Sequence, residues 1–179
     1  MPDQYLATSR RISSQFIAYL VGRLSIDDFA EWVRQTPELT TVLSPTDYTE
    51  LMSIDFQHAK APSLLDRLLR GYIDWAQYEK EQLAELLMAI IWKDDLAASL
   101  ATAQEQFKHG LRFMNVLSNE YGKSILSTQG LKKADERLLA SVYPKVCDEA
   151  KRLLACLVAG KIKFTGTYTS EGYPEYVEV

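Results

Sequence analysis

Histidine and cysteine are scarce in this chain, which has two of each among its 179 residues. Metal sites on helices need several such ligands at fixed spacings, and neither a His-Glu-x-x-His motif nor paired Glu-x-x-His motifs occur. Glu105 lies one helical turn before His109, and Asp55 lies three residues before His58; we interpret both pairs as helix-surface contacts. A Gly-x-Ser-x-Gly nucleophile motif is lacking as well. The residues therefore predict a protein that is not an enzyme and uses no metal or other cofactor.

The two cysteines, Cys147 and Cys156, lie nine residues apart in an apolar stretch. In a continuous helix they would be about 13.5 Å apart along the axis, which is too far for a disulfide bond. We therefore expect two buried thiols, as is usual in a reducing cytoplasm.

Long apolar runs are also lacking. The longest stretches without a polar residue, residues 86–92 and 153–160, are far shorter than the roughly 20 residues of a membrane-spanning helix. The first residues carry neither the basic nor the apolar region of a secretory signal peptide. These features predict a cytoplasmic protein that does not bind a membrane.

Basic residues are outnumbered, with 20 Lys and Arg against 24 Asp and Glu, a net charge of −4 and a pI near 5.3. This balance argues against a nucleic-acid-binding protein, which would neutralise phosphates with a broad basic face. Acidic proteins instead favour basic partners through complementary electrostatic fields. Glycine is also infrequent, at eight residues, whereas an all-β protein needs many tight turns.

Helix signals are frequent in the first third of the chain. An apolar repeat that includes Phe16 precedes Gly22, a residue that favours the end of a helix. Ser25, with Asp28 three residues later, matches a capping box at the start of the next helix.

Two further helix starts are predicted by a capping residue followed by proline. Thr36-Pro37 and Ser44-Pro45 both place proline at the first helical position, where its missing N–H is harmless. Residues 9–56 therefore predict four short helices, and another helix is expected to open at Ser63.

The clearest helix is predicted to begin at Asp74, with Gln77 in the capping-box position. Apolar residues follow at helical spacing, and either Asp94 or Asp95 could begin a new helix. Residues of these and later stripes that we expect in the core are Leu87, Ile90, Phe107 and Leu138.

The last third changes character along its length. Residues 118–130 predict a loop, and the apolar stripe of residues 131–157 predicts a long helix that Pro144 should kink or split. Residues 161–168 and 173–179 alternate and favour β structure, which predicts a hairpin packed on the helices. We predict a mainly α fold: one bundle of six to eight helices over residues 1–160, with a tail or short β-hairpin at 161–179.

Surplus acid is concentrated between residues 25 and 55, which hold seven acidic residues and one basic residue, a balance of −6. Acids near helix starts are favoured by the helix dipole, which accounts for about half of this excess. The rest suggests a surface that docks a basic protein. The candidate partner-binding acids are Asp27, Asp28, Glu31, Glu38, Asp47, Glu50 and Asp55.

Tyrosines of the tail form a second candidate surface. Tyr168, Tyr173 and Tyr176 alternate with acidic residues and are expected to be exposed. Tyrosine beside acid is typical of surfaces that recognise basic partners.

One stretch of the chain, residues 12–56, resembles small acidic bacterial immunity proteins of polymorphic or contact-dependent toxin systems. The residues that carry the resemblance are Phe16, Leu20, Gly22, Ser25-Ile-Asp-Asp-Phe29, Glu31-Trp32-Val33, Glu38-Leu39, Leu43, Tyr48-Thr-Glu-Leu51 and Ile54-Asp55-Phe56. The resemblance implies a non-enzymatic, bacterial, cytoplasmic protein that binds and blocks one cognate toxin domain. From the charge pattern we expect its acidic surface to make this contact. The alternative that we weigh is a helical adaptor or regulator with an apolar groove for a partner helix.

Overall fold

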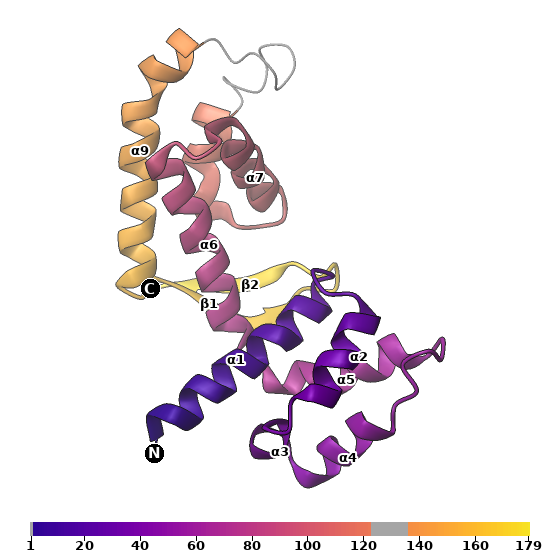
Figure 1. Cartoon of the computed structure of the whole chain (residues 1–179). Helices are drawn as coiled ribbons and strands as arrows, with labels where there is room; N and C mark the ends of the chain where they lie inside the picture. Colours follow the sequence, from indigo (N-terminus) through magenta and orange to yellow (C-terminus); the bar gives the residue numbers. More distant parts are fainter. Residues whose placement is uncertain (1, 123–135) are drawn as a thin grey trace. The chain divides into compact units, whose positions relative to one another are not determined.

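The computed structural model describes residues 2–122 and 136–179, and the side chains of residues 5–120 and 141–179 (Figure 1). The fold is mainly α with a C-terminal β-hairpin, which confirms the predicted class. The chain folds into two compact units, Met1–Ile73 (unit 1) and Asp74–Val179 (unit 2). This boundary lies within the range for which the sequence predicted one helical domain.

Unit 1 is built from short helices whose starts are capped as predicted. Ser25 and Ser44 each accept a hydrogen bond from the backbone N–H three residues later, and Pro45 begins its helix. Gly22 follows the first helix with a φ of 74°. The elements are α1 (Pro2–Leu20), α2 (Ile26–Gln35), α3 (Leu39–Val42), α4 (Pro45–Ser53), α5 (Ala61–Leu69) and the 3-10 helix η1 (Arg70–Tyr72).

Two predicted helix starts in unit 1 are wrong. Thr36 ends α2 instead of opening the next helix, because its hydroxyl donates 2.7 Å back to the carbonyl of Trp32. Glu38 then precedes α3. The helix expected to open at Ser63 already begins at Ala61, so Ser63 lies in its first turn.

Aromatic side chains form the centre of the unit 1 core. The fully buried Phe16 ring contacts Phe29, Trp32 and Tyr72 at centroid distances of 6.2, 5.9 and 6.5 Å. Tyr19 stacks on Phe29 at 4.5 Å. Burial of this aromatic surface, together with the buried aliphatic side chains of the unit, holds the short helices together.

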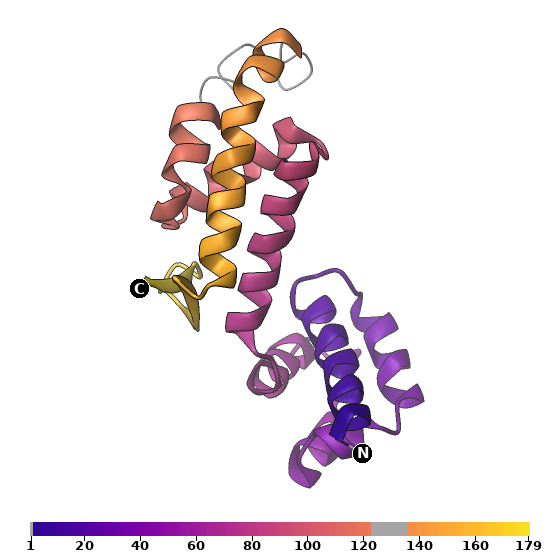
Figure 2. The same ribbon diagram turned by 90° about the vertical axis from the view of Figure 1, so that its left-hand side faces the viewer.

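Unit 2 is organised around two long helices that lie side by side in Figures 1 and 2, α6 (Trp75–Trp92) and α9 (Glu136–Val158). Asp74 caps α6 through the N–H of Gln77, as predicted. The remaining elements are α7 (Leu96–Lys108), the 3-10 helix η2 (Arg112–Met114), the π-helix η3 (Val116–Gly122), β1 (Ile162–Tyr168) and β2 (Pro174–Glu178).

Three predictions for unit 2 are settled or corrected. Asp95, and not Asp94, caps the start of α7. Helix α9 runs through Pro144 without a split. A loop was predicted for residues 118–130, but residues 118–122 belong to η3. The remainder of this range lies outside the described residues.

The residues predicted for the core of unit 2 are only in part buried. Leu87 and Ile90 are fully buried, as predicted, whereas Phe107 packs against the core only partly buried. The side chain of Leu138 lies outside the described residues. Trp92, at the end of α6, is 73% exposed.

The two cysteines are free, as expected for their spacing in one helix. Cys147 is buried, whereas Cys156 is only half-buried, so the prediction of two buried thiols holds for the first alone. Within residues 2–122 and 136–179, the helices fall short of the length and apolar character that crossing a membrane requires.

The C-terminal hairpin packs on α6 through a glycine. Strands β1 and β2 pair antiparallel with Phe164 opposite Tyr176, and the register shifts between Phe164 and Tyr168. Gly166, in this irregular stretch, has a φ of 79°, and a Cβ there would lie 3.3 Å from the backbone nitrogen of Ala76. The residue therefore meets two demands, a left-handed backbone and a close approach to the helix.

Replacing Gly166 by alanine should lower the free energy of unfolding by more than the backbone strain alone, which costs about 1–2 kcal/mol. Gly172 is the matched control, because it has a φ of 83° but open space around the added Cβ. Urea unfolding of both alanine variants measures the difference. Equal losses for the two variants would show that the contact with Ala76 is unimportant.

Candidate partner-binding surface

The start of α2 fixes the first two candidate acids. The backbone N–H of Asp28 donates to the Ser25 hydroxyl at 3.1 Å, and that hydroxyl donates to the Asp28 carboxylate at 2.6 Å. Asp27 also lies in this first turn, where the helix dipole stabilises negative charge. Both side chains are exposed. Their position is thus explained by the fold, and their carboxylates still face solvent.

Gln57 brings a third acid beside them. Its side-chain amide donates to the Asp27 carboxylate at 2.8 Å, and its backbone N–H donates to the Asp55 carboxylate at 3.0 Å. Beneath this link the ring of Phe56 contacts that of Phe29 at 6.4 Å. The segment after α4 is therefore folded back onto the start of α2, which brings Asp27 and Asp55 to the same side chain, Gln57.

Glu31 adds a carboxylate that helix stability does not call for. It lies one turn after Asp27 and Asp28, where like charges destabilise a helix by about 0.2–0.5 kcal/mol per pair. Its described partner is the neutral amide of Gln35, at 3.0 Å. We call Asp27, Asp28, Glu31 and Asp55 together the acidic face. All four are exposed, and in the part of the chain that the structure describes none of them forms an ion pair.

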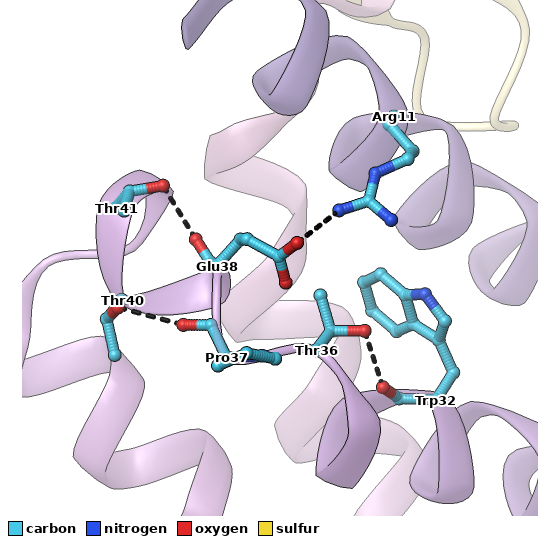
Figure 3. Close-up of polar contacts among 7 residues, drawn as sticks. All are labelled: Arg11, Trp32, Thr36, Pro37, Glu38, Thr40 and Thr41. Carbon is cyan, nitrogen blue, oxygen red and sulfur yellow. Dashed lines mark hydrogen bonds and ion pairs between the residues drawn. The ribbon is translucent and has the colours of Figure 1, made fainter. Parts of the chain in front are cut away.

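Two other candidate acids are neutralised by arginines. Glu38 binds Arg11 at 3.1 Å, and Glu50 binds Arg67 at 2.5 Å. Figure 3 shows the Glu38 carboxylate directed at the Arg11 guanidinium. Such exposed pairs contribute little to stability, but they remove local charge that could attract a partner.

Asp47 serves the fold. Its carboxylate accepts hydrogen bonds from the Ser44 hydroxyl at 2.7 Å and from the Tyr72 hydroxyl. The hydrogen bond from Tyr72, followed by that from Ser44, lowers the pKa of Asp47 below its usual range. The Tyr72 hydroxyl also accepts from the backbone N–H of Ser44 at 3.0 Å, so it ties η1 to the start of α4.

The charge surplus of residues 25–55 is largely balanced within its own unit. Residues 1–73 contain seven basic and nine acidic residues, a net charge of −2, which is half of the −4 of the whole chain. What distinguishes unit 1 is therefore the placement of unpaired acid on the acidic face and not its total charge.

Tail tyrosines are half-buried rather than exposed, which corrects the expectation from sequence. Tyr168 donates to Glu79 at 2.7 Å and packs edge-on against Trp75. Tyr173 stacks on His109 with ring centroids 4.3 Å apart.

Tyr176 follows the same pattern, since its hydroxyl accepts from the backbone N–H of Arg112 at 3.1 Å and its ring lies edge-on to Phe113. All three tyrosines thus fasten the hairpin to the helices of unit 2. Sequence reasoning missed Glu79, Arg11, Arg67 and Gln57, because each pairs with a residue far along the chain.

The histidines take part in local structure. The His58 imidazole accepts from the backbone N–H of Lys60 at 3.1 Å, and Glu105 pairs with Lys108 at 2.7 Å and not with His109. Among the described side chains, no group of three or more His, Cys, Asp or Glu is placed to hold a metal ion.

Comparison with protein-family models, with curated proteins and with solved structures finds no match to this chain.

Because hydrogen bonds lower the pKa of Asp47, its contribution to stability is present above the unfolded-state pKa of about 3.9 and is lost as pH falls through the lower folded-state value. Tyr72→Phe removes the larger of the two hydrogen bonds. The variant should be less stable than the parent at neutral pH and should lose less further stability on acidification. Thermal melts at neutral and strongly acidic pH measure this.

Tyr48→Phe is the matched control for the same loss of a hydroxyl, because no hydrogen bond of the Tyr48 hydroxyl is described. Its pH dependence should follow that of the parent. If Tyr72→Phe also loses as much stability in acid as the parent, the hydrogen bond to Asp47 does not set this pH response.

Proposed function

We propose that this protein is a non-enzymatic immunity protein that binds a cognate bacterial toxin and neutralises it by covering a basic surface. The observation that carries the proposal is the acidic face, four exposed carboxylates held by neutral partners. Asp27 and Asp28 have evident stabilising roles at the helix start, whereas Glu31 lies one turn beyond them and brings a further like charge beside theirs. Its placement is better explained by a partner that supplies the missing positive charge.

The acidic face is organised before any partner arrives. Gln57 fixes one oxygen of Asp27 and one of Asp55, which leaves the second oxygen of each available to an incoming guanidinium or ammonium group. Preorganised charge of this kind mainly accelerates encounter, and opposite fields can raise association rates by about 10- to 10³-fold. A cytoplasmic inhibitor that must capture a toxin quickly would benefit from such a surface.

The alternative of an adaptor with an apolar groove has less support. The hollow described along α4 of unit 1 is lined by Pro45, Thr46, Thr49, Glu50 and Ser53. None of these is a large apolar side chain, whereas the groove for an amphipathic partner helix is lined by large apolar side chains that bury the apolar face of that helix.

A direct test uses the genes that flank this one. Each neighbouring product is expressed in bacteria alone and together with this protein, and growth and co-purification are recorded. One product should be toxic alone, harmless in the presence of this protein and recovered in a stoichiometric complex with it. If a toxic neighbour is found and this protein neither binds it nor restores growth, the proposal is wrong.

Removal of charge from the acidic face should slow capture of that partner. The triple variant Asp27→Asn, Glu31→Gln and Asp55→Asn retains oxygen acceptors for Gln57 and Gln35, so its melting temperature should stay near that of the parent. Its association rate at low salt should fall by about tenfold or more and depend less on salt. Stopped-flow or surface-plasmon measurements over a salt series provide both values.

A variant with the same change in net charge separates position from total charge. Glu85→Gln, Asp148→Asn and Glu178→Gln neutralise three exposed acids of unit 2. This control should bind nearly as fast as the parent. Equal slowing by both triple variants would mean that net charge alone steers association and that the acidic face is not the contact surface.

A further inference from the structure

Unit 2 contains a half-buried carboxylate that the proposed function does not use. Glu79 lies in the second turn of α6, and one of its oxygens accepts the hydrogen bond from Tyr168. Among the described residues the second oxygen has no partner. Burial raises the pKa of Glu79 above its usual range, and the hydrogen bond from Tyr168 opposes this shift only in part. Partial burial of this carboxylate thus costs free energy, and the single hydrogen bond from Tyr168 does not fully offset that cost.

Beside this carboxylate lies a small hollow of about 110 Å³. Its polar lining comes from Glu79 and Gln82 on α6 and from Thr102 and Gln106 on α7. Its apolar lining includes Leu83, Leu111 and Phe164, all of which belong to the buried core. The lining therefore combines an acid, two amides and a hydroxyl with aliphatic and aromatic side chains.

The volume limits what the hollow can hold. A cavity of about 150 Å³ accommodates benzene, which has six heavy atoms. By the same ratio, 110 Å³ accommodates about four. A single water molecule would leave most of the apolar lining without contact, whereas a short carbon chain would cover it.

We propose that this hollow binds a short aliphatic primary amine, with the ammonium group against Glu79 and the carbon chain against Leu83, Leu111 and Phe164. An ammonium group has three donors, which suit the second Glu79 oxygen and the side-chain carbonyl of Gln106. A cation also offsets the cost of the half-buried carboxylate, which a neutral ligand does not. The site is independent of the acidic face and would stand if the immunity function were disproved.

The test is an NMR titration of the full chain with n-propylamine, which is protonated at neutral pH and has four heavy atoms. Amide signals of Gln106, Leu111 and Phe164 should shift together, with a dissociation constant of about 0.1–1 mM, as expected for so small a ligand. n-Propanol has the same size without the charge and should bind at least tenfold more weakly. Equal affinities for the amine and the alcohol, or no shift of these signals with the amine, would overturn the proposal.

Two variants locate the charge that is responsible. Glu79→Gln keeps an acceptor for Tyr168 and should weaken propylamine binding at least tenfold. Glu81→Gln, an exposed change on the same helix, should leave binding unchanged. If Glu79→Gln binds the amine as well as the parent, the assignment to Glu79 is wrong; if this variant fails to fold, the comparison of amine with alcohol on the parent decides the matter.

Discussion

Unpaired backbone N–H groups at helix starts are the constraint on which unit 1 depends. The first four N–H groups of any helix lack partners within it. In α2 and α4, which have ten and nine residues, these groups are close to half of the helix. The hydroxyls of Ser25 and Ser44 each accept a hydrogen bond from one of these N–H groups, that of the aspartate three residues later. In α2 and α4 the caps therefore bring acid to the helix starts, and folding itself accounts for part of the negative charge of this unit.

Function would then depend on the acids that capping does not require. The Asp47 carboxylate is hydrogen-bonded to Ser44 and Tyr72, and Glu38 and Glu50 form ion pairs with arginines. Among the described residues, the candidate acids that remain exposed without a cation are those of the acidic face, two of which hydrogen-bond to Gln57. Charge counted along the sequence overestimates the surface that is available to a partner, because ion pairs across the unit remove part of it.

Local signals can be read from the sequence, and non-local ones cannot. The caps at Ser25, Ser44 and Asp74 are predicted correctly because the interaction spans only three residues. The prediction at Thr36 is wrong because a threonine hydroxyl can end a helix as readily as it can begin one. Pro144 does not split α9, because the apolar stripe that follows it, including Val146 and Ala150, is buried in the core.

The features that could not be predicted from the sequence are contacts between residues far apart in the chain. Gln57 meets Asp27 across 30 residues, and Tyr168 meets Glu79 across 89. Tyr168 and Tyr176 point inward because the strand register assigns them to the helix side, and a shift of one residue would reverse this; Tyr173 lies in the link between the strands. Alternation of tyrosine with acid indicates a strand but not which side of it faces the core.

The distribution of the three tryptophans gives each unit its own optical signal. Trp32 is the tryptophan of unit 1 and lies half-buried against Phe16 and Phe29, whereas Trp75 and Trp92 belong to unit 2. An indole among aromatic rings emits at shorter wavelength than one in water, and Trp92 is 73% exposed. In a chain with phenylalanine at positions 75 and 92, the remaining tryptophan fluorescence comes from Trp32 and reports on unit 1 alone. The unfolding of unit 1 can then be distinguished from that of unit 2 in one intact molecule.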